Sequence, residues 1–302
     1  PSPSQGEGQP ALGGQGEGAS RSYPPSAFPQ PHVKKVISEM GGKNAIIIDT
    51  SADLDEAVLG VRYSAFGFAG QKCSACSRCI VIDPEGPNGQ HITRFTERLV
   101  EATRALVVAP PTSPSCDVGP VIDDAAATNI RRMINLGTEH GGKLLIGDDD
   151  FPPSPSQGEG AERSEAGEGV KPTNYIPPHI LTNTTPANPI AQDEIFGPVL
   201  AVMHAHNLDE ALTIANTHTY KLTGGLFSRK PEHIERTKRE FRVGNLYINR
   251  SCTGALVGRQ PFGGFGLSGV GSKAGGSDYL FQFVEPRAIC ENTMRRGFAP
   301  EL

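Results

Sequence analysis

The sequence lacks the features that mark membrane, exported and nucleic-acid-binding proteins. No apolar run approaches the ~20 residues that a helix needs to cross a bilayer. The first residues show no basic region followed by an apolar core. Charges of both signs are scattered along the chain, with a net charge of −5, so there is no basic stripe for nucleic acid. We therefore expect a soluble, cytoplasmic protein that acts on a small molecule, with no membrane and no nucleic-acid partner.

Cysteine is also scarce, with six in 302 residues. A chain of this length with no exported leader is expected to keep its thiols reduced and to have no disulfide framework. The spacing of Cys73, Cys76 and Cys79 is compatible with a metal or iron–sulfur site, but a fourth ligand at the usual spacing is missing and Cys116 is distant. We predict no metal site, and a cysteine-rich metal or redox protein remains the third alternative for function.

Glycine and proline are abundant, and they concentrate in two segments. The octapeptide Pro-Ser-Pro-Ser-Gln-Gly-Glu-Gly occurs at 1–8 and again at 153–160. Such segments cannot bury enough apolar surface to offset the entropy of ordering them. We predict a disordered, low-complexity segment at 1–32, one domain at 33–290 with a low-complexity insert at about 148–172, and a C-terminal tail at 291–302.

Between these segments the pattern alternates between strands and helices. Asp53 with Glu56 is typical of a capping box, and Pro231 of a helix start. Strands that alternate with helices predict an α/β fold, a mostly parallel sheet flanked by helices, with ligands at the carboxyl ends of the strands. The predicted strands are 33–38, 44–49, 79–82, 143–146, 199–203, 224–227 and 246–249, and the predicted helices are 54–68, 92–106, 122–136, 207–215 and 231–241.

Cys73 has the sequence setting of a reactive thiol. It follows Gly70-Gln71, and glycine permits a sharp turn that brings the main chain close to a substrate. Backbone N–H groups at such a turn favour a thiolate, which is the nucleophilic form. Upstream, Glu39 leads into a double glycine before an apolar run and is a candidate general base. Taken alone, Cys73 could equally be a packed thiol and Glu39 a solvated turn residue.

At this pair the chain resembles the aldehyde dehydrogenase superfamily, in which Glu-(Leu/Met)-Gly-Gly carries the base and Gly-Gln-x-Cys the nucleophile. Three further segments agree in order, and two of them are similar to the branch called 1-pyrroline-5-carboxylate dehydrogenase, which oxidises L-glutamate γ-semialdehyde. The resemblance implies an NAD-dependent enzyme of this family that acts in proline degradation. The three segments begin at Glu194, Asn249 and Gln260.

The resemblance also implies individual roles. Cys73 attacks the aldehyde to give a thiohemiacetal, and Glu39 deprotonates the water that hydrolyses the resulting thioester. Glu194 binds the nicotinamide ribose and Phe196 lies beside the nicotinamide. The residues implied to bind the substrate are Ser74, Gly254, Ala255 and Phe262.

One expected part of the family pattern is missing. No Gly-x-Gly-x-x-Gly follows a predicted strand, and the resemblance covers only the C-terminal catalytic half, with the Rossmann-like cofactor domain largely absent. We therefore expect NAD as the cofactor by resemblance, a homo-oligomer, and dependence on a separate cofactor-domain chain. The alternative is a truncated, non-oxidising remnant with at most ester hydrolysis by Cys73 and Glu39.

Overall fold

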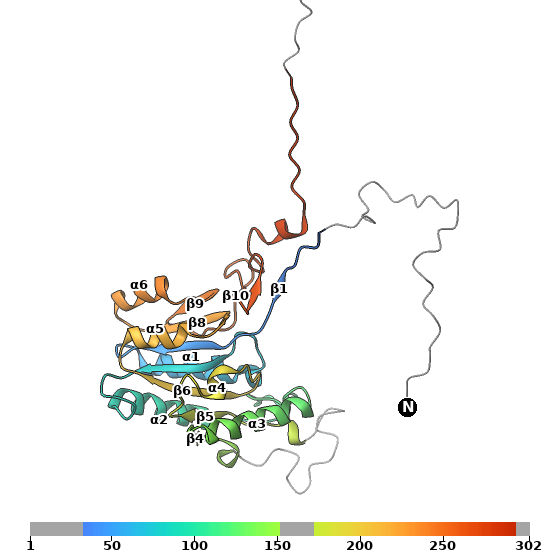
Figure 1. Cartoon of the computed structure of the whole chain (residues 1–302). Helices are drawn as coiled ribbons and strands as arrows, with labels where there is room; N and C mark the ends of the chain where they lie inside the picture. The colour runs from blue at the N-terminus through green and yellow to red at the C-terminus, as the bar shows by residue number, and fades with distance from the viewer. Residues whose placement is uncertain (1–32, 152–171, 294–302) are drawn as a thin grey trace, which may run out of the picture. The chain divides into compact units, whose positions relative to one another are not determined.

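A seven-stranded sheet organises the fold (Figure 1). The computed structural model describes residues 33–151 and 172–293. Within them the strand order is β4-β5-β6-β3-β2-β8-β9, and β4 is antiparallel to β5 whereas the other pairs are parallel. The predicted, mostly parallel sheet is thus confirmed. The strands are β2 (Asn44–Ile48), β3 (Cys76–Ile82), β4 (Lys143–Ile146), β5 (His179–Thr182), β6 (Val199–Ala205), β8 (Thr223–Phe227) and β9 (Asn245–Ile248).

The helices begin where the sequence provides a cap. The Asp53 side chain accepts hydrogen bonds from the first turn of α1, Asn207 does the same for α5, and Pro231 opens α6. These side chains satisfy N–H groups that have no partner inside the helix. The helices are α1 (Leu54–Phe66), α2 (Gln90–Arg104), α3 (Asp124–Glu139), α4 (Pro189–Gln192), α5 (Leu208–Asn216) and α6 (Pro231–Glu240).

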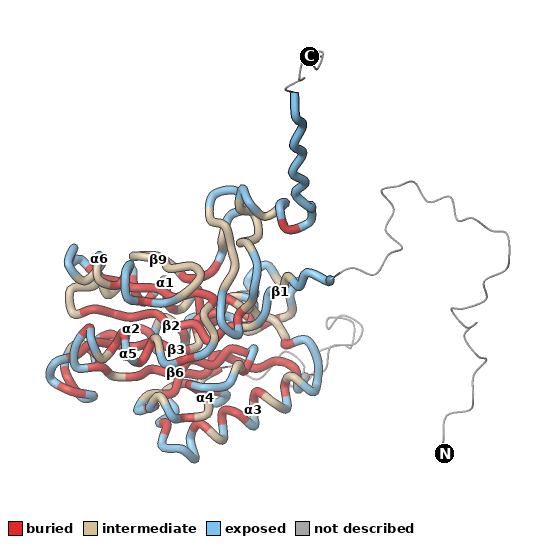
Figure 2. Tube along the Cα trace, turned by 45° about the horizontal axis from the view of Figure 1, so that its top comes forward, coloured by how far each residue is buried: buried red, intermediate tan, exposed pale blue. Residues whose placement is uncertain are grey.

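Alternate residues of the central strands pack into two separate hydrophobic cores. Ile46 and Ile48 of β2 pack in the cluster that contains α1 and α2, whereas Ala45 and Ile47 pack in the cluster that contains α5. Because successive side chains of a strand point to opposite faces, helices cover both faces of the sheet. Figure 2 shows β2, β3 and β6 as buried strands in the middle of the fold.

A buried carboxylate ties the carboxyl ends of β2 and β8 together. Asp49 follows β2, and its side chain accepts hydrogen bonds from the hydroxyls of Ser51 (2.6 Å) and Ser228 (2.7 Å) and pairs with His233 Nδ1 (3.0 Å). Burial raises the pKa of Asp49, but these hydrogen bonds and the histidine lower it by more, so its pKa lies below the ordinary value. The network joins loops that precede α1 and α6.

Two predicted elements differ from the structure. The strand predicted at 33–38 is reduced to β1 (Ser38–Glu39), because residues 33–37 pair with no strand in the described chain. The helix predicted at 122–136 runs instead from Asp124 to Glu139, so Gly137 does not end it. A Cβ on Gly137 would lie 2.8 Å from Ile190 Cγ2, so glycine is needed there for helix packing.

Two short antiparallel pairs extend from the amino side of the main sheet. β1 pairs with β11 (Gly269–Val270), which fixes Glu39 opposite Gly269, and β7 (Tyr220–Lys221) pairs with β10 (Phe265–Gly266). Beyond the short helix η4 (Tyr279–Phe283) the chain is extended and exposed up to residue 293 (Figure 2).

The predicted low-complexity segments fall mainly on residues 1–32 and 152–171, which lie outside the described residues, as does most of the tail. Packed structure reaches Phe151, because Asp148–Asp150 form a short 3₁₀ helix and the Phe151 side chain is buried in a core cluster. None of the helices described here is long and apolar enough to span a bilayer.

Candidate active site

The predicted nucleophile and base lie at the amino ends of parallel strands. Cys73 precedes β3, and Glu39 precedes β2 by a short glycine turn. The two strands pair with Asn44 opposite Cys76, so the turn and the cysteine loop are neighbours. These two candidate residues therefore do not lie at the carboxyl ends of the strands, where ligands were expected; there the loops after β2 and β8 form the network around Asp49.

Asn44 fastens the cysteine loop to the sheet. Its Nδ2 donates to the carbonyl oxygens of Cys73 and Ala75, each at 2.8 Å, and its Oδ1 accepts from the N–H of Thr223 at 2.9 Å. Two of these bonds reach the cysteine loop and the third reaches β8, so one amide fixes the position of the cysteine against β2 and β8. Sequence reasoning missed Asn44, since nothing in its local pattern distinguishes it from an ordinary first residue of a strand.

The approach to Cys73 is tightly turned. The 3₁₀ helix η1 (Gly67–Gly70) contains Phe68 and Ala69 with φ of 59° and 53°. Such left-handed conformations are costly for residues with a Cβ and persist where the surrounding structure holds them. Gly70 also has a positive φ, and a Cβ there would lie 2.2 Å from the Gly197 carbonyl oxygen. The cysteine loop is therefore held against the segment that carries Phe196.

The Cys73 thiol is partly buried, and its pKa is raised. Burial is the main cause, the backbone N–H of Ser74 opposes it, and the negative charges of Glu194 and Glu39 raise the pKa further. The predicted backbone N–H donors are present, but they lower the pKa of the thiol by less than burial raises it. The resting thiol is therefore protonated near neutral pH and needs a proton acceptor before it can attack.

Glu39 is exposed on β1 and close enough for its charge to affect the Cys73 thiol. Its carboxylate is thus available to solvent beside a partly buried sulfur. An exposed carboxylate can exchange its proton with solvent, as a base that acts on a water molecule must.

Glu194 lies against the glycine pair that follows Glu39. Its Oε1 accepts the Gly42 N–H at 2.9 Å. A Cβ on Gly41 would lie 2.0 Å from Glu194 Oε2, and one on Gly42 would lie 2.4 Å from the Cys73 carbonyl oxygen. Both glycines are therefore needed so that the carboxylate and the cysteine loop can approach the same turn.

Phe196 is placed at the edge of this cluster. Its side chain is 45% exposed and its φ is 57°. The segment lines a cavity of about 20 Å³ that also touches Gly42, Cys76 and Glu194. An exposed aromatic ring held in a strained backbone is available to pack against a flat ligand.

A hydrogen bond between two hydroxyl groups joins the predicted substrate turn to the cysteine loop. Ser74 Oγ and Thr253 Oγ1 are 2.9 Å apart, and both side chains are buried. The next residue, Gly254, has a left-handed φ of 79°, and Ala255 is partly buried. A left-handed glycine in such a turn suits consecutive N–H groups that converge on an anion.

Phe262 is held on a separate segment. It pairs with Ala274 in an isolated antiparallel bridge, and its N–H donates to the Ala274 carbonyl at 2.9 Å. No hydrogen bond in the described chain joins Phe262 to Cys73, so its place in the site rests on the resemblance alone.

The other cysteines of the cluster are inside the protein. Cys76, Cys79 and Cys252 are fully buried; the Cys76 thiol donates to the Arg78 carbonyl at 3.4 Å and the Cys252 thiol to the Ser74 carbonyl at 3.5 Å. Across residues 33–151 and 172–293, no group of three or more His, Cys, Asp or Glu side chains is arranged to hold a metal ion.

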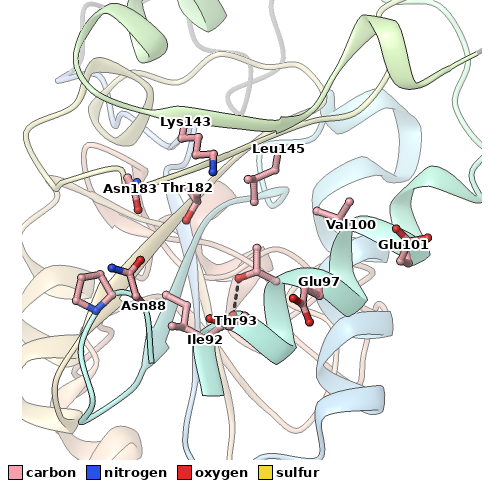
Figure 3. A pocket seen from close by; sticks show the side chains of 12 residues that line it. Asn88, Ile92, Thr93, Glu97, Val100, Glu101, Lys143, Leu145, Thr182 and Asn183 are labelled. Carbon is pink, nitrogen blue, oxygen red and sulfur yellow. Dashed lines mark hydrogen bonds between the residues drawn. The ribbon is translucent and has the colours of Figure 1, made fainter. Parts of the chain in front are cut away.

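A larger hollow lies elsewhere, between α2 and the strands β4 and β5. Its volume is about 620 Å³, and Figure 3 shows Glu97 and Glu101 on the helix opposite Lys143 on the strand. None of the predicted site residues lines it. The lining residues are Pro87, Asn88, Ile92, Thr93, Thr96, Glu97, Val100, Glu101, Lys143, Leu145, Thr182 and Asn183.

Comparison with known proteins identifies the family of the chain. Residues 26–289 match the aldehyde dehydrogenase family. The chain is 42% identical over 274 residues to 1-pyrroline-5-carboxylate dehydrogenase of Geobacillus thermodenitrificans, which covers 90% of this chain and 48% of that protein. The chain thus spans about half the length of this curated relative.

Solved structures of related proteins are also similar to this chain. Proline utilization A from Bdellovibrio bacteriovorus, inactivated by N-propargylglycine, is 49% identical with a TM-score of 0.77, covering 90% of this chain and 26% of that one. The 1-pyrroline-5-carboxylate dehydrogenase from Thermus with bound NAD is 44% identical with a TM-score of 0.70, covering 82% and 43%.

Proposed function

Because the chain belongs to the aldehyde dehydrogenase family, we propose that it carries the catalytic residues for oxidation of L-glutamate γ-semialdehyde (1-pyrroline-5-carboxylate) to L-glutamate with NAD, a step of proline degradation. The observation that supports this most is that Glu194 and the Cys73 loop lie against the same glycine turn, Gly41–Gly42, which directly follows Met40 and Glu39 in the chain. The names of the similar proteins support the choice of substrate.

In the proposed reaction Cys73 is the nucleophile. Because its pKa is raised, the thiol gives up its proton as its sulfur bonds to the aldehyde carbon, and we assign solvent water as the acceptor of that proton. The new S–C bond leaves negative charge on the former carbonyl oxygen. We assign the backbone N–H of Cys73 as a donor to that oxygen.

The residues around Glu194 fit a nicotinamide cofactor. Glu194 is oriented by the Gly42 N–H and would hold the ribose hydroxyls, and the exposed ring of Phe196 would pack beside the nicotinamide. NAD, when bound, supplies the acceptor for the hydride that leaves the thiohemiacetal carbon. The protein's part is to orient these groups and to keep the acyl group on Cys73.

Hydrolysis of the thioester completes the proposed cycle. Glu39 takes a proton from a water molecule, the water oxygen bonds to the acyl carbon, and the S–C bond breaks to release glutamate and regenerate the Cys73 thiol. The exposure of Glu39 suits this role, because the carboxylate must exchange its proton with solvent.

For the substrate we propose that its amino-acid carboxylate binds the N–H groups of Gly254 and Ala255, with the Ser74 hydroxyl as a further donor. The bond between Ser74 and Thr253 holds this turn next to the nucleophile. Phe262 packs on the aliphatic part of the substrate in this proposal.

Formation of NADH from 1-pyrroline-5-carboxylate tests the proposal. We expect little NADH from the 302-residue chain alone, and Cys73-dependent NADH when the first half of the Geobacillus thermodenitrificans relative is supplied as a separate chain. Cys290→Ala, at an exposed cysteine outside the site, is the matched control. NADH formation that survives Cys73→Ala would contradict the proposed chemistry.

A second candidate is a chain that only hydrolyses esters or thioesters through Cys73 and Glu39, or has lost activity. Cleavage of p-nitrophenyl esters without NADH formation in the supplemented assay would indicate a chain that only hydrolyses esters. Absence of both activities would indicate a non-catalytic remnant.

We also propose that the chain forms a homo-oligomer through its C-terminal segment. Large apolar side chains in and after η4 are exposed, which is unusual for a monomer surface. Sedimentation of the wild type against a variant with three of these side chains changed to serine tests this. The exposed residues are Leu280, Phe281, Phe283, Val284 and Ile289.

A further inference from the structure

His218 makes two hydrogen bonds that fix the position of its ring proton. The residue lies in the turn between α5 and β7 and is 6% exposed. Its Nε2 is 2.6 Å from the Gln192 carbonyl oxygen, and its Nδ1 is 3.1 Å from the backbone nitrogen of Tyr220. A carbonyl can only accept a hydrogen bond and a backbone N–H can only donate one. The proton is therefore on Nε2, Nδ1 carries none, and the ring is neutral.

The surroundings of His218 oppose a positive charge on the ring. A second proton, on Nδ1, would face the Tyr220 N–H, and both groups would be donors. Burial is the largest cause that holds the pKa of His218 below its ordinary value of 6.5, the bond to the Gln192 carbonyl opposes it, and three nearby cations lower the pKa further. These cations are Arg78 of β3, the buried Lys43 before β2 and Lys221 of β7.

The bond to Gln192 holds the end of α4, which leads directly to Glu194. Gln192 and Asp193 are exposed, and the His218 bond joins this stretch to the turn before β7. On this side the Gln192 carbonyl faces the ring, and the carboxylates of Asp193 and Glu194 come next in the chain. The Glu194 carboxylate accepts the Gly42 N–H at 2.9 Å. Loss of the histidine bond would thus remove a contact that fixes the stretch carrying Glu194.

We propose that His218 is a positioning residue for Glu194: its neutral ring holds the Gln192 carbonyl so that the Glu194 carboxylate reaches the Gly42 amide. Protonation of Nδ1 places two donors face to face, so the ring turns away from Tyr220 and its Nε2 leaves Gln192. Because the pKa of the folded chain lies below 6.5, the arrangement is complete above pH 6.5 and is lost as the pH falls through the lower folded value. The proposal rests on the proposed function, since it takes Glu194 as the residue that binds the cofactor ribose.

The first test determines which ring nitrogen carries the proton. In a chain labelled with ¹⁵N-histidine, the ring signals lost in His218→Gln are assigned to His218 and followed with pH by NMR. We expect a proton on Nε2 alone at pH 7.5 and a titration midpoint below 6.5. A proton on Nδ1 at pH 7.5 would overturn the proposal.

The second test measures exchange of the Gly42 amide hydrogen with solvent, as a protection factor, one pH unit above and one below that midpoint. We expect protection in the wild type to fall about fivefold between the two, the effect of losing one hydrogen bond, and His218→Leu to show the lower value at both. The Asp83 amide, which donates to the Ala205 carbonyl at the other edge of the sheet, should be unaffected. His206→Leu, at an exposed histidine after β6, is the control variant and should behave like the wild type.

His218→Gln separates positioning from packing. Glutamine supplies an N–H donor in place of Nε2 but does not titrate. We therefore expect the protection of Gly42 to stay high on both sides of the midpoint. Protection that still falls with pH in His218→Gln would overturn the proposal, as would an equal loss at Gly42 and Asp83 in His218→Leu, which is the result expected if the ring only fills space.

Circular dichroism of each variant establishes that it is folded before protection factors are compared, and the titration of the wild type needs no variant to fold. None of these measurements uses aldehyde or NAD. The positioning role of His218 and the proposed dehydrogenase reaction can therefore fail independently of each other.

Discussion

Replacing Lys43 with methionine should stabilise the protein, and the gain should depend on pH. Methionine fills a similar volume without a charge. The pKa of Lys43 falls from 10.5 to about 7 on folding. Because a tenfold change in an acid dissociation constant corresponds to about 1.4 kcal/mol, burial of the ammonium costs up to about 5 kcal/mol.

The direction of this pH dependence follows from the number of protons that the folded and unfolded chains bind. Between pH 7 and 10.5 the unfolded chain holds the Lys43 proton and the folded chain does not, so the free energy of unfolding of the wild type rises with pH across this window. Below pH 7 both states hold the proton and the full cost remains. The advantage of Lys43→Met should therefore be largest at pH 6, at up to about 5 kcal/mol, and fall to about 2 kcal/mol at pH 9.

Urea unfolding followed by circular dichroism at pH 6 and pH 9 measures both values. Lys238→Met on α6 is the control, because Lys238 is half exposed and paired with Glu235, and its effect should not change over this range. A variant at Lys43 that is less stable than the wild type, or whose advantage is the same at both pH values, would refute the reasoning.

Three further predictions concern the frame of the site. Gly42→Ala should lower the ester hydrolysis rate roughly 100-fold, because its Cβ would lie 2.4 Å from the Cys73 carbonyl oxygen and displace the loop; Gly119→Ala, with its nearest contact at 3.4 Å, should leave the rate unchanged, and equal rates in both variants would count against this. Asn44→Ala should lower the free energy of unfolding in urea by about 3 kcal/mol, since it leaves buried backbone groups unpaired, and a loss within error of zero would be inconsistent with that. In the wild type the pKa of Asp49 is lowered, so its stabilising contribution is complete above the ordinary value of 3.8 and is lost as pH falls through the lower folded value; Asp49→Asn should lack this part of the acid unfolding curve, and identical curves would refute the assignment.

The sequence predicted six of the seven strands of the main sheet and five helices in order because its signals there are local, but it did not predict β5 or α4. The cap at Asp53, the proline at 231 and the apolar runs of the strands depend on neighbouring residues only. The helix end at Gly137 was predicted wrongly because the glycine is required by contact with Ile190, which is far away in the sequence and cannot be seen in a local pattern. The strand at 33–38 failed for the same reason, since pairing partners decide whether a short run becomes a strand.

The candidate site could likewise be predicted only in those features that depend on local sequence. The family pattern around Cys73 and Glu39 pointed to two segments that the structure places next to each other, but it did not predict the edge of the sheet on which they lie. The raised pKa of the thiol, the amide bridge of Asn44 and the buried charge of Lys43 all depend on tertiary contacts. Electrostatic environment is a property of the folded chain and is not encoded in residue spacing.

The most direct test of the account is to trap the acyl group. Glu39→Gln should react with p-nitrophenyl acetate and accumulate one acetyl group on the peptide Cys73–Arg78, whereas the wild type should release it and Cys73→Ala should not acquire it. Acetylation at another cysteine, or equal accumulation in the wild type and Glu39→Gln, would contradict the assignment of nucleophile and base.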